Sequence, residues 1–489
     1  MLPSVVQNAT KTLRLSICVS TQASFISTTT TATAGRRPRA HPNHGLRVDR
    51  NSLGSTKSQR CTHTTAKWRP VQALDDWVAK EARPISLRQL MVFGRSLTEA
   101  RLISSANYVR TELPARIAHR IRDMQRLPYV VVTNRHIGDV YELYYTAFDT
   151  FRRVKEIKTL EDNDKFCSVI ASMLRAHLTV IPKLAMGILE CNGLMPAANL
   201  DRFMNTILRS RISRRVIAEQ HLALTETFNS DWFSPGAKLS ESEFIGEVFL
   251  KCVARDVVER CGKTVQELAR SAYGADAAIP EIKIDGDLEV NFPYILSHLE
   301  YIIGELLRNS VQAVVEHHGK NRKTGEKPPP IEVTLCEAQQ NVIIRISDRG
   351  GGISRDMLPH LWSFGKGPST PQRLENLGQV PLMAATLQEL RIDGNFSELQ
   401  NMFPDRHSRS DSGGYNSENH NGSLTTLSAR PPNLRLGISL PLSRVYAEYW
   451  AGSLELHSLE GYGVDAFLQI SKLGNKNEQL ATRAAMDAV

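Results

Sequence analysis

The seven cysteines of this 489-residue chain include no C-x-x-C pair. They are scattered at positions 18, 61, 167, 191, 252, 261 and 336. This spacing provides neither a zinc ligand set nor a disulfide framework, and it fits a reducing compartment. The chain also lacks an apolar run near the ~20 residues that a helix needs to cross a bilayer. We therefore expect no membrane span.

Acidic residues are almost missing from the first 67 positions. Residues 1–67 contain ten Lys or Arg and one acid, Asp49. The whole chain has a net charge of +9, so this leader accounts for the entire excess and the remainder is balanced. A balanced body offers no general basic surface, and we expect no nucleic-acid partner. Abundant Ser, Thr, Ala and Arg are typical of a mitochondrial transit peptide, with a disordered basic tail as the alternative.

Two widespread phosphate-binding signatures are also missing. The sequence has no glycine loop followed by V-A-I-K, and no H-R-D or D-F-G motif. The run Gly262-Lys263-Thr264 lacks the glycine five residues upstream that a P-loop requires. Eukaryotic-type protein kinases and P-loop enzymes are therefore excluded.

Helical periodicity dominates residues 77–239. Hydrophobic and charged contents of 41% and 23% are globular values, and the length favours two or three domains. Apolar residues recur at helical spacing over 105–131, 142–151, 166–189 and 200–224. Pro114 should bend or break the first of these helices. Long helices with short connections predict an antiparallel bundle.

The pattern changes to mixed helix and strand over residues 240–472. We expect a helix over 247–271 and strands over 281–284, 331–336, 342–347, 453–458 and 464–470. These elements predict an α/β sandwich with one mixed sheet and helices on one face. Within it, residues 401–432 are rich in Ser, Asn, Gly, Arg and Pro. They cannot bury enough apolar surface to order, which predicts a mobile insertion.

The stretch GELLRNSVQAVVEHH, residues 304–318, predicts an amphipathic helix. Glu305 and Asn309 stand four apart, so they project from one face. A carboxylate there can accept a hydroxyl proton, and an amide oxygen can hold a magnesium ion that bridges phosphates. Read alone, the pattern also fits an ordinary helix with a solvated polar face.

Two glycine motifs follow this helix. An alternating strand runs into Asp348 and then Gly350–Gly352, and such glycines let the backbone approach a ligand closely. Gly437 opens a second loop, before a helix that begins near Leu440. Backbone N–H groups at a helix N-terminus favour a triphosphate anion. Read separately, the motifs also fit a tight turn and a plain strand-to-helix connection.

In this order the three motifs resemble the GHKL ATP-binding fold of gyrase-type ATPases, certain chaperones and histidine kinases. The stretches ELPARIAHRI, RAHLTVIPKLAMG and SRISRRVIAEQHLAL narrow the resemblance to the mitochondrial protein kinases of 2-oxoacid dehydrogenases. The resemblance covers roughly residues 77–472. It implies a regulatory bundle at 77–239 that docks on a lipoyl domain, and an ATP-binding kinase domain at 240–472. It makes 401–432 an enlarged ATP lid and leaves 473–489 as a tail.

The resemblance also implies roles for single residues. Asn309 would hold Mg²⁺, and Glu305 would orient or deprotonate the incoming serine hydroxyl. Asp348 would accept the exocyclic amine of adenine, with Gly350 and Gly352 shaping that side of the pocket.

The remaining implied site residues lie in the second loop and in the bundle. Gly437 and Leu440 belong to the phosphate-binding loop. His177 matches a family histidine that lies near the catalytic carboxylate, so the resemblance implies that it orients Glu305 and is not itself phosphorylated.

Several residues depart from the family pattern. Gln312 stands where an arginine is usual, which removes a phosphate-facing charge, and Arg308 replaces a lysine. Arg435 and Ser439 occupy glycine positions of the second loop, and Arg435 could itself contact phosphates. Val464 replaces a threonine near the adenine. These departures bear on nucleotide affinity.

The expected function is a serine kinase of the mitochondrial matrix that uses ATP and Mg²⁺. It would inactivate the dehydrogenase (E1 alpha) subunit of a 2-oxoacid dehydrogenase complex, with pyruvate dehydrogenase as first choice. Branched-chain 2-oxoacid dehydrogenase is the alternative, favoured by HLALTE and by the lack of an Asp-Trp pair near the C-terminus. Expected partners are this subunit, the lipoyl domain and a second copy of the chain. A histidine kinase using His177 and a non-catalytic ATP-binding regulator are further alternatives.

Overall fold

The computed structural model describes residues 71–95, 97–229, 244–274, 277–321, 327–367, 370–386, 389, 430 and 434–480. All of them lie in the unit Arg69–Val489, which is separate from Met1–Trp68. The predicted leader, 1–67, lies outside the described residues. So does the predicted insertion, 401–432, except for Arg430, which is buried.

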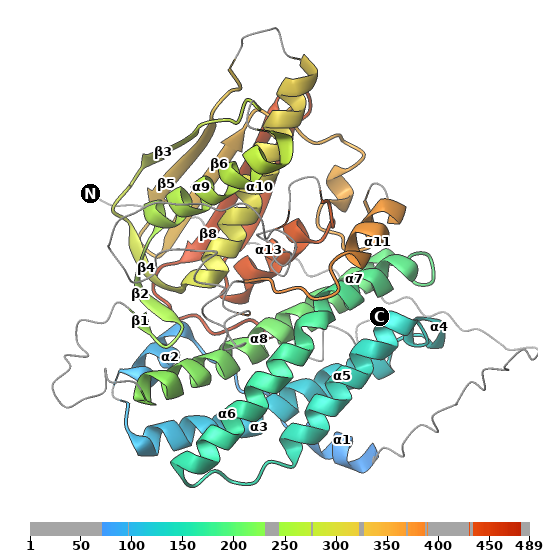
Figure 1. Cartoon of the computed structure of the whole chain (residues 1–489), viewed down its shortest axis with the longest axis vertical. Helices are drawn as coiled ribbons and strands as arrows, with labels where there is room; N and C mark the ends of the chain where they lie inside the picture. Colours follow the sequence, from blue (N-terminus) through green and yellow to red (C-terminus); the bar gives the residue numbers. More distant parts are fainter. Residues whose placement is uncertain are drawn as a thin grey trace, which may run out of the picture. The chain divides into compact units, whose positions relative to one another are not determined.

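Long helices fill the region in which the sequence predicts a bundle (Figure 1). Shorter helices accompany them, and α3 packs against both α5 and α8. The elements of this region are α1 (Val71–Val78), α2 (Leu87–Gly94), α3 (Glu99–Gln125), α4 (Tyr129–Val132), α5 (Arg135–Arg152), α6 (Leu160–Ala176), η1 (His177–Thr179), α7 (Val180–Glu190) and α8 (Ala197–Asn229). The prediction of a helical N-terminal region is confirmed.

Pro114 does not break its helix, in contrast to one of the two predicted outcomes. α3 runs through it for 27 residues, and Pro114 is buried. A proline inside a helix costs about 3 kcal/mol or more. The buried neighbours Leu113, Ile117 and Ala118 pack in the core, and this tertiary packing offsets the local cost.

One stretch of the bundle, Leu160–Glu190, is long and apolar enough to cross a membrane by length and composition alone. This stretch is an exception to the predicted lack of long apolar runs. In the structure this stretch is α6, η1 and α7, which contact α5 and α8. Its side chains Phe166, Ile170 and Leu184 lie in the core of the bundle.

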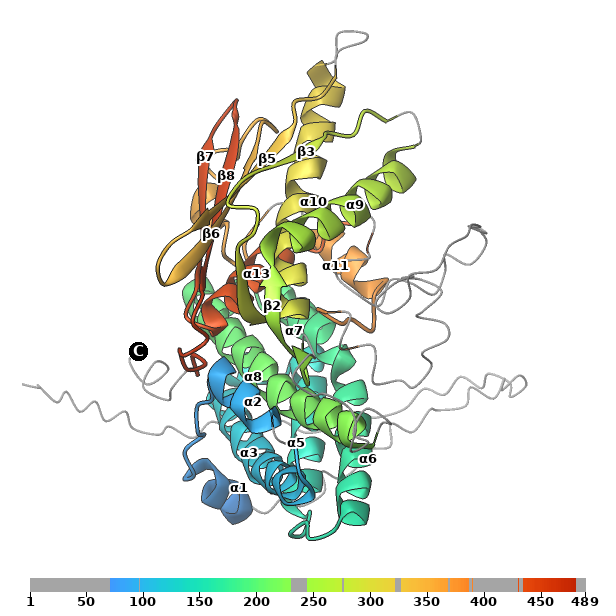
Figure 2. The same ribbon diagram turned by 90° about the vertical axis from the view of Figure 1, so that its left-hand side faces the viewer.

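A five-stranded mixed sheet forms the second part of the unit, in the order β3-β5-β6-β8-β7. Only β3 and β5 are parallel among these pairs. Helices cover one face of the sheet, as the sequence predicts (Figure 2). The elements are β3 (Ile282–Gly286), β5 (Ile331–Glu337), β6 (Asn341–Asp348), β7 (Ser453–Leu459), β8 (Gly463–Ser471), α9 (Ala254–Tyr273), α10 (Leu296–Asn321) and α13 (Ser439–Tyr449).

A smaller sheet corrects one prediction. β1 (Phe244–Ile245), β2 (Val248–Val253) and β4 (Asn291–Ile295) pair in that order, and both pairs are antiparallel. The predicted helix over 247–271 is wrong for β2, and only its later part is helical, as α9. The run VFLKCV is rich in aromatic and β-branched residues, and it pairs with a strand about forty positions away.

Two side-chain contacts, one buried and one partly exposed, connect the bundle to the segments around the sheet. Arg211 on α8 donates to both carboxylate oxygens of Glu389, at 2.8 and 2.5 Å. Arg209 on the same helix donates to Glu448 on α13 at 2.8 Å. Between β6 and α13 lie η4 (Leu358–His360) and α11 (Thr370–Gly378), and α11 contacts α7. The bundle therefore supports the segments that lead into the second glycine loop.

Candidate active site

Helix α10 presents a buried apolar stripe and a polar stripe. Ile302, Ile303, Leu306, Leu307, Val311 and Val314 are buried in the core. At 100° per residue, Glu305, Asn309, Gln312 and Glu316 fall on one other side of the helix. The sequence prediction that Glu305 and Asn309 share a face therefore agrees with the helix as it is formed.

Glu305 has no exposed surface. Its two carboxylate oxygens accept hydrogen bonds from Nη1 and Nη2 of Arg430, at 3.1 and 2.8 Å. The Nε atom of Arg308, one turn along the helix, lies 3.6 Å from Oε1. Burial lowers the pKa of Arg308 to about 10 against the attraction of Glu305, so Arg308 is charged at neutral pH.

Tyr301 lies one turn before Glu305 on α10. Burial, and next the charge of Glu305, raise the pKa of the Tyr301 phenol well above its usual range. Its hydroxyl lies 3.5 Å from the carbonyl oxygen of Ser439, the first residue of α13. Tyr301 thus connects the helix that carries Glu305 to the first residue of α13.

Asp348 ends β6 on the side that the helices cover. Alternate residues of this strand are buried, so Asp348 follows Val342, Ile344 and Ile346 toward α10. The carboxylate accepts hydrogen bonds from the hydroxyl of Ser310 on α10 and from the backbone N–H of Gly350, both at 2.9 Å. Burial raises the pKa of Asp348. A fixed, buried carboxylate at this position can accept an amine donor.

The glycines after Asp348 are required by close contacts. A Cβ atom on Gly350 would lie 2.5 Å from the Cβ of Ala313 on α10. A Cβ on Gly352, which has φ of +72°, would lie 2.2 Å from the carbonyl oxygen of Leu459. The predicted pocket-shaping glycines therefore hold this loop against both α10 and the β7–β8 hairpin.

The second glycine loop is fixed by two residues that the sequence analysis missed, both on α11. Arg373 donates to the carbonyl oxygens of Leu436 and Gly437, at 3.2 and 3.0 Å. Asn376 donates to the carbonyl oxygen of Arg435 at 2.9 Å. Side-chain contacts to backbone carbonyls across about sixty positions leave no local sequence pattern that could have shown them.

The loop leads into a helix end suited to an anion. Gly437 has φ of +68°, which favours glycine. Helix α13 then begins at Ser439, and its N-cap residue, Ile438, makes no side-chain capping hydrogen bond. Ser439 is buried and Leu440 is half-buried. The first backbone N–H groups of α13 are donors that phosphate oxygens could accept.

Arg435 contacts α10 from this loop. Its Nη2 atom lies 2.6 Å from both carboxylate oxygens of Glu316, and Gln312 donates to the same carboxylate at 2.9 Å. Burial alone would raise the pKa of Glu316, but the hydrogen bonds from Arg435 and Gln312 lower it. The two departures at positions 312 and 435 thus meet at one carboxylate.

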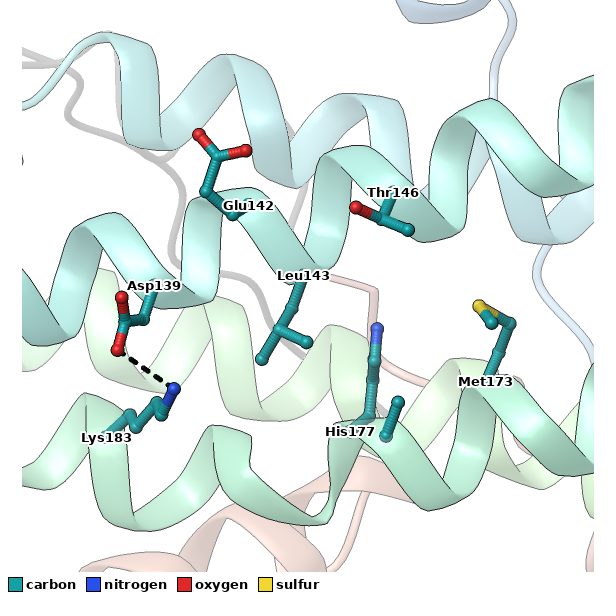
Figure 3. Close-up of a pocket in the computed structure, with 8 residues that line it drawn as sticks. Asp139, Glu142, Leu143, Thr146, Met173, His177 and Lys183 are labelled. Atoms are coloured by element: carbon teal, nitrogen blue, oxygen red, sulfur yellow. Dashed lines mark hydrogen bonds and ion pairs between the residues drawn. The ribbon is translucent and has the colours of Figure 1, made fainter. Parts of the chain in front are cut away.

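His177 does not contact Glu305, which corrects the implied orienting role. Its ring stacks on Tyr144 with centroids 5.4 Å apart, and it lines a pocket of about 280 Å³ in the bundle. Figure 3 shows the ring pointing toward the helix that carries Leu143 and Thr146. Burial lowers the pKa of His177 to about 3. This histidine packs within the bundle, and the carboxylate of Glu305 is held by arginines.

These residues fit a nucleotide with a bound magnesium ion. Asp348 offers a buried acceptor beside glycines that exclude side chains, and α13 offers uncapped N–H donors near Gly437. Asn309 is half-buried on the same stripe of α10, with its amide available as an oxygen ligand. The described site thus offers an acceptor that could hold a base, a helix end that could bind phosphates and one side chain that could ligate a metal.

Comparison with known families matches both parts of the chain. Residues 84–249 match the model described as mitochondrial branched-chain alpha-ketoacid dehydrogenase kinase. Residues 295–472 match the model described as histidine kinase-, DNA gyrase B-, and HSP90-like ATPase.

Among curated relatives, a mitochondrial pyruvate dehydrogenase (acetyl-transferring) kinase 2 from Saccharomyces cerevisiae is 34% identical over 427 residues. That alignment covers 83% of this chain and 85% of the relative. The corresponding kinase from Arabidopsis thaliana is 28% identical, over 84% of this chain and 96% of its own. Isozyme 3 from Homo sapiens is 25% identical, over 81% and 84%. The chain belongs to the family of mitochondrial 2-oxoacid dehydrogenase kinases, within the GHKL group of ATP-binding proteins.

Proposed function

We propose that this chain is a mitochondrial kinase that transfers the γ-phosphoryl group of ATP to a serine hydroxyl of pyruvate dehydrogenase. The target is the dehydrogenase (E1 alpha) subunit, which phosphorylation inactivates. The names of the relatives support this substrate. The observation that carries the proposal is the geometry of α10. Glu305 and Asn309 share a stripe, and Ser310 binds Asp348 to the same helix.

The residues divide the work of phosphoryl transfer. Bound MgATP supplies the phosphoryl group and neutralises charge on the phosphates. Asn309 would hold the metal through its amide oxygen, and Asp348 would accept the exocyclic amine of the base. The Gly437 loop and the first turn of α13 bind the phosphates through backbone N–H groups. Glu305 orients the serine hydroxyl and accepts its proton.

The proposal includes partners and a location. In this proposal, residues 77–239 dock on the lipoyl domain of the acyltransferase core. The active kinase is a homodimer in the mitochondrial matrix. The word mitochondrial in the names of the relatives supports the compartment. The basic leader, 1–67, supports import as a transit peptide.

Branched-chain 2-oxoacid dehydrogenase is a second candidate substrate. The family model that matches residues 84–249 carries the name of that kinase. The relatives that align with the greater part of the chain are named pyruvate dehydrogenase kinases. We therefore retain pyruvate dehydrogenase as the proposed substrate.

A histidine kinase that uses His177 as acceptor is not favoured. The Nε2 atom of His177 is buried and has no hydrogen-bond partner among the described residues. Acid-labile phosphate on the chain after incubation with labelled ATP would restore this alternative. A non-catalytic regulator predicts ATP binding without phosphorylation of either dehydrogenase.

One experiment tests the proposal. The chain without its leader is incubated with MgATP, lipoylated core and each purified dehydrogenase in turn, and the phosphate is located by mass spectrometry. We expect acid-stable phosphoserine on the pyruvate dehydrogenase subunit. Preferential phosphorylation of the branched-chain enzyme would overturn the choice of substrate, and phosphate on neither would overturn kinase activity.

A further inference from the structure

Residue 430 is attached to α10 by both its side chain and its backbone. The Arg430 guanidinium binds the two carboxylate oxygens of Glu305, and the Arg430 carbonyl oxygen accepts a hydrogen bond from Arg308. Glu305 and Arg308 are three residues apart on α10, so they contact residue 430 from adjacent turns of the helix. We propose that Arg430 is an autoinhibitory residue that occludes Glu305, so that phosphoryl transfer requires this contact to open. This inference rests on the proposed function.

Burial is the main argument for occlusion. Glu305 has 0% exposed surface, and the side chain of Arg430 is 6% exposed. A base must come within about 2.6–3.2 Å of the hydroxyl whose proton it accepts. A serine carried by another protein cannot reach a carboxylate that has no exposed surface. The guanidinium must therefore leave before the serine can take its place.

A second arginine, five residues after Arg430, forms an ion pair with the same polar stripe of α10. Arg435 binds Glu316, as described above. Glu305 and Glu316 are eleven residues apart, or about 16 Å along a helix. The two arginines thus bracket the part of α10 that carries Asn309. The pair at Glu316 is partly exposed, whereas the pair at Glu305 is buried, so it is the Arg430 contact that controls access to the base.

The expected step is simple in its chemistry. Once Arg430 moves away, Glu305 accepts the proton of the serine hydroxyl while the serine oxygen forms a bond to the γ-phosphorus. The bond from that phosphorus to the bridging oxygen breaks, and ADP leaves with this oxygen. Arg430 contributes no atom to the transfer and only blocks access to Glu305. Its removal should therefore increase the rate of phosphoryl transfer.

Carbodiimide labelling measures the occlusion without any need for catalysis. The whole chain is treated with a water-soluble carbodiimide and glycine ethyl ester, and labelled carboxylates are found by mass spectrometry. Glu161, which is 79% exposed, serves as the internal reference. We expect Glu305 to be protected in the wild type and to be labelled about tenfold faster in Arg430→Met. The variant loses both hydrogen bonds from Arg430 and keeps, among the described residues, only Arg308 at 3.6 Å, and a buried carboxylate so poorly paired is costly and moves toward water. Arg430→Lys, which keeps the charge without the paired donors, should be intermediate.

Kinase turnover provides the second measurement. With pyruvate dehydrogenase as acceptor, Arg430→Met should raise kcat by about tenfold if the open form is populated at roughly 10%. Arg255→Met is the matched control, because it removes a surface ion pair on α9. It should leave turnover unchanged.

The outcomes separate this inference from the proposed function. Labelling of wild-type Glu305 at the rate of Glu161, or a fall in kcat in Arg430→Met, would overturn autoinhibition, and the first needs no variant to fold. Protection of Glu305 that is lost in Arg430→Met, with no phosphate transfer by either protein, would support occlusion and overturn the proposed kinase activity.

Discussion

The contact between the loop after β6 and helix α10 depends on the absence of a side chain at Gly350. In Gly350→Ala, the new Cβ would lie 2.5 Å from the Cβ of Ala313 and 2.9 Å from its carbonyl carbon. The second atom belongs to the helix backbone, so the loop must move away from α10. Overpacking of this kind costs about 1–3 kcal/mol. The movement also displaces the Gly350 N–H from Asp348, which we assign to the base of ATP.

The expected result is a loss of nucleotide affinity. If about 1.4 kcal/mol of the cost falls on the bound state, the Kd for ATP rises about tenfold. Isothermal titration calorimetry measures the Kd, and thermal unfolding measures stability in parallel. Gly319→Ala, on α10, is the matched control, because its Cβ would meet nothing within 4 Å. It should stabilise the helix by up to about 1 kcal/mol and leave the Kd unchanged. A folded Gly350→Ala protein that binds ATP within about twofold of wild type would refute the reasoning.

Three further predictions concern the supports of the site. Arg373→Met removes the donor to the carbonyl oxygens of Leu436 and Gly437 and should raise the Kd for ATP at least about tenfold, measured by titration. Glu389→Gln should cost about 3–5 kcal/mol of unfolding free energy, since it breaks a buried pair with Arg211. Although burial alone would raise the pKa of Glu389, the arginines lower it to about 2, so this stabilisation should be present above pH 4.5 and lost as the pH falls toward 2 in urea titrations. At Asp348 the pH dependence of stability has the opposite sign. Its pKa is raised in the folded protein, so ionisation of this carboxyl disfavours folding. The wild type should therefore lose stability relative to Asp348→Asn as the pH rises above 3.8. No pH-dependent difference between these two proteins would contradict that assignment.

The sequence predicted the parts of the fold whose patterns are local. β5 and β6 alternate apolar and polar residues, and α10 repeats apolar residues at helical spacing, so both were assigned correctly. β2 was assigned to a helix because its short run of apolar residues fits either period. Only its pairing with β4, a distant segment that contains a proline, shows that it is a strand.

The candidate site divides in the same way. Glu305, Asn309 and Asp348 could be found because each lies in a compact motif with fixed spacing. Arg430 and Arg373 could not, because their contacts with Glu305 and with Gly437 join segments separated by 125 and 64 positions. The role implied for His177 failed for a related reason. A resemblance fixes the position of a residue in the chain, but the packing of the bundle decides what its ring contacts.

The most direct test of the account compares two properties of one variant. Glu305→Gln is assayed for phosphate transfer to pyruvate dehydrogenase and for ATP binding in the same buffer. We expect transfer to fall about 10²- to 10⁴-fold, while the Kd for ATP stays within about twofold, because Glu305 acts on the serine and not on the nucleotide. Transfer at the wild-type rate, or an equal loss of binding and transfer, would contradict it.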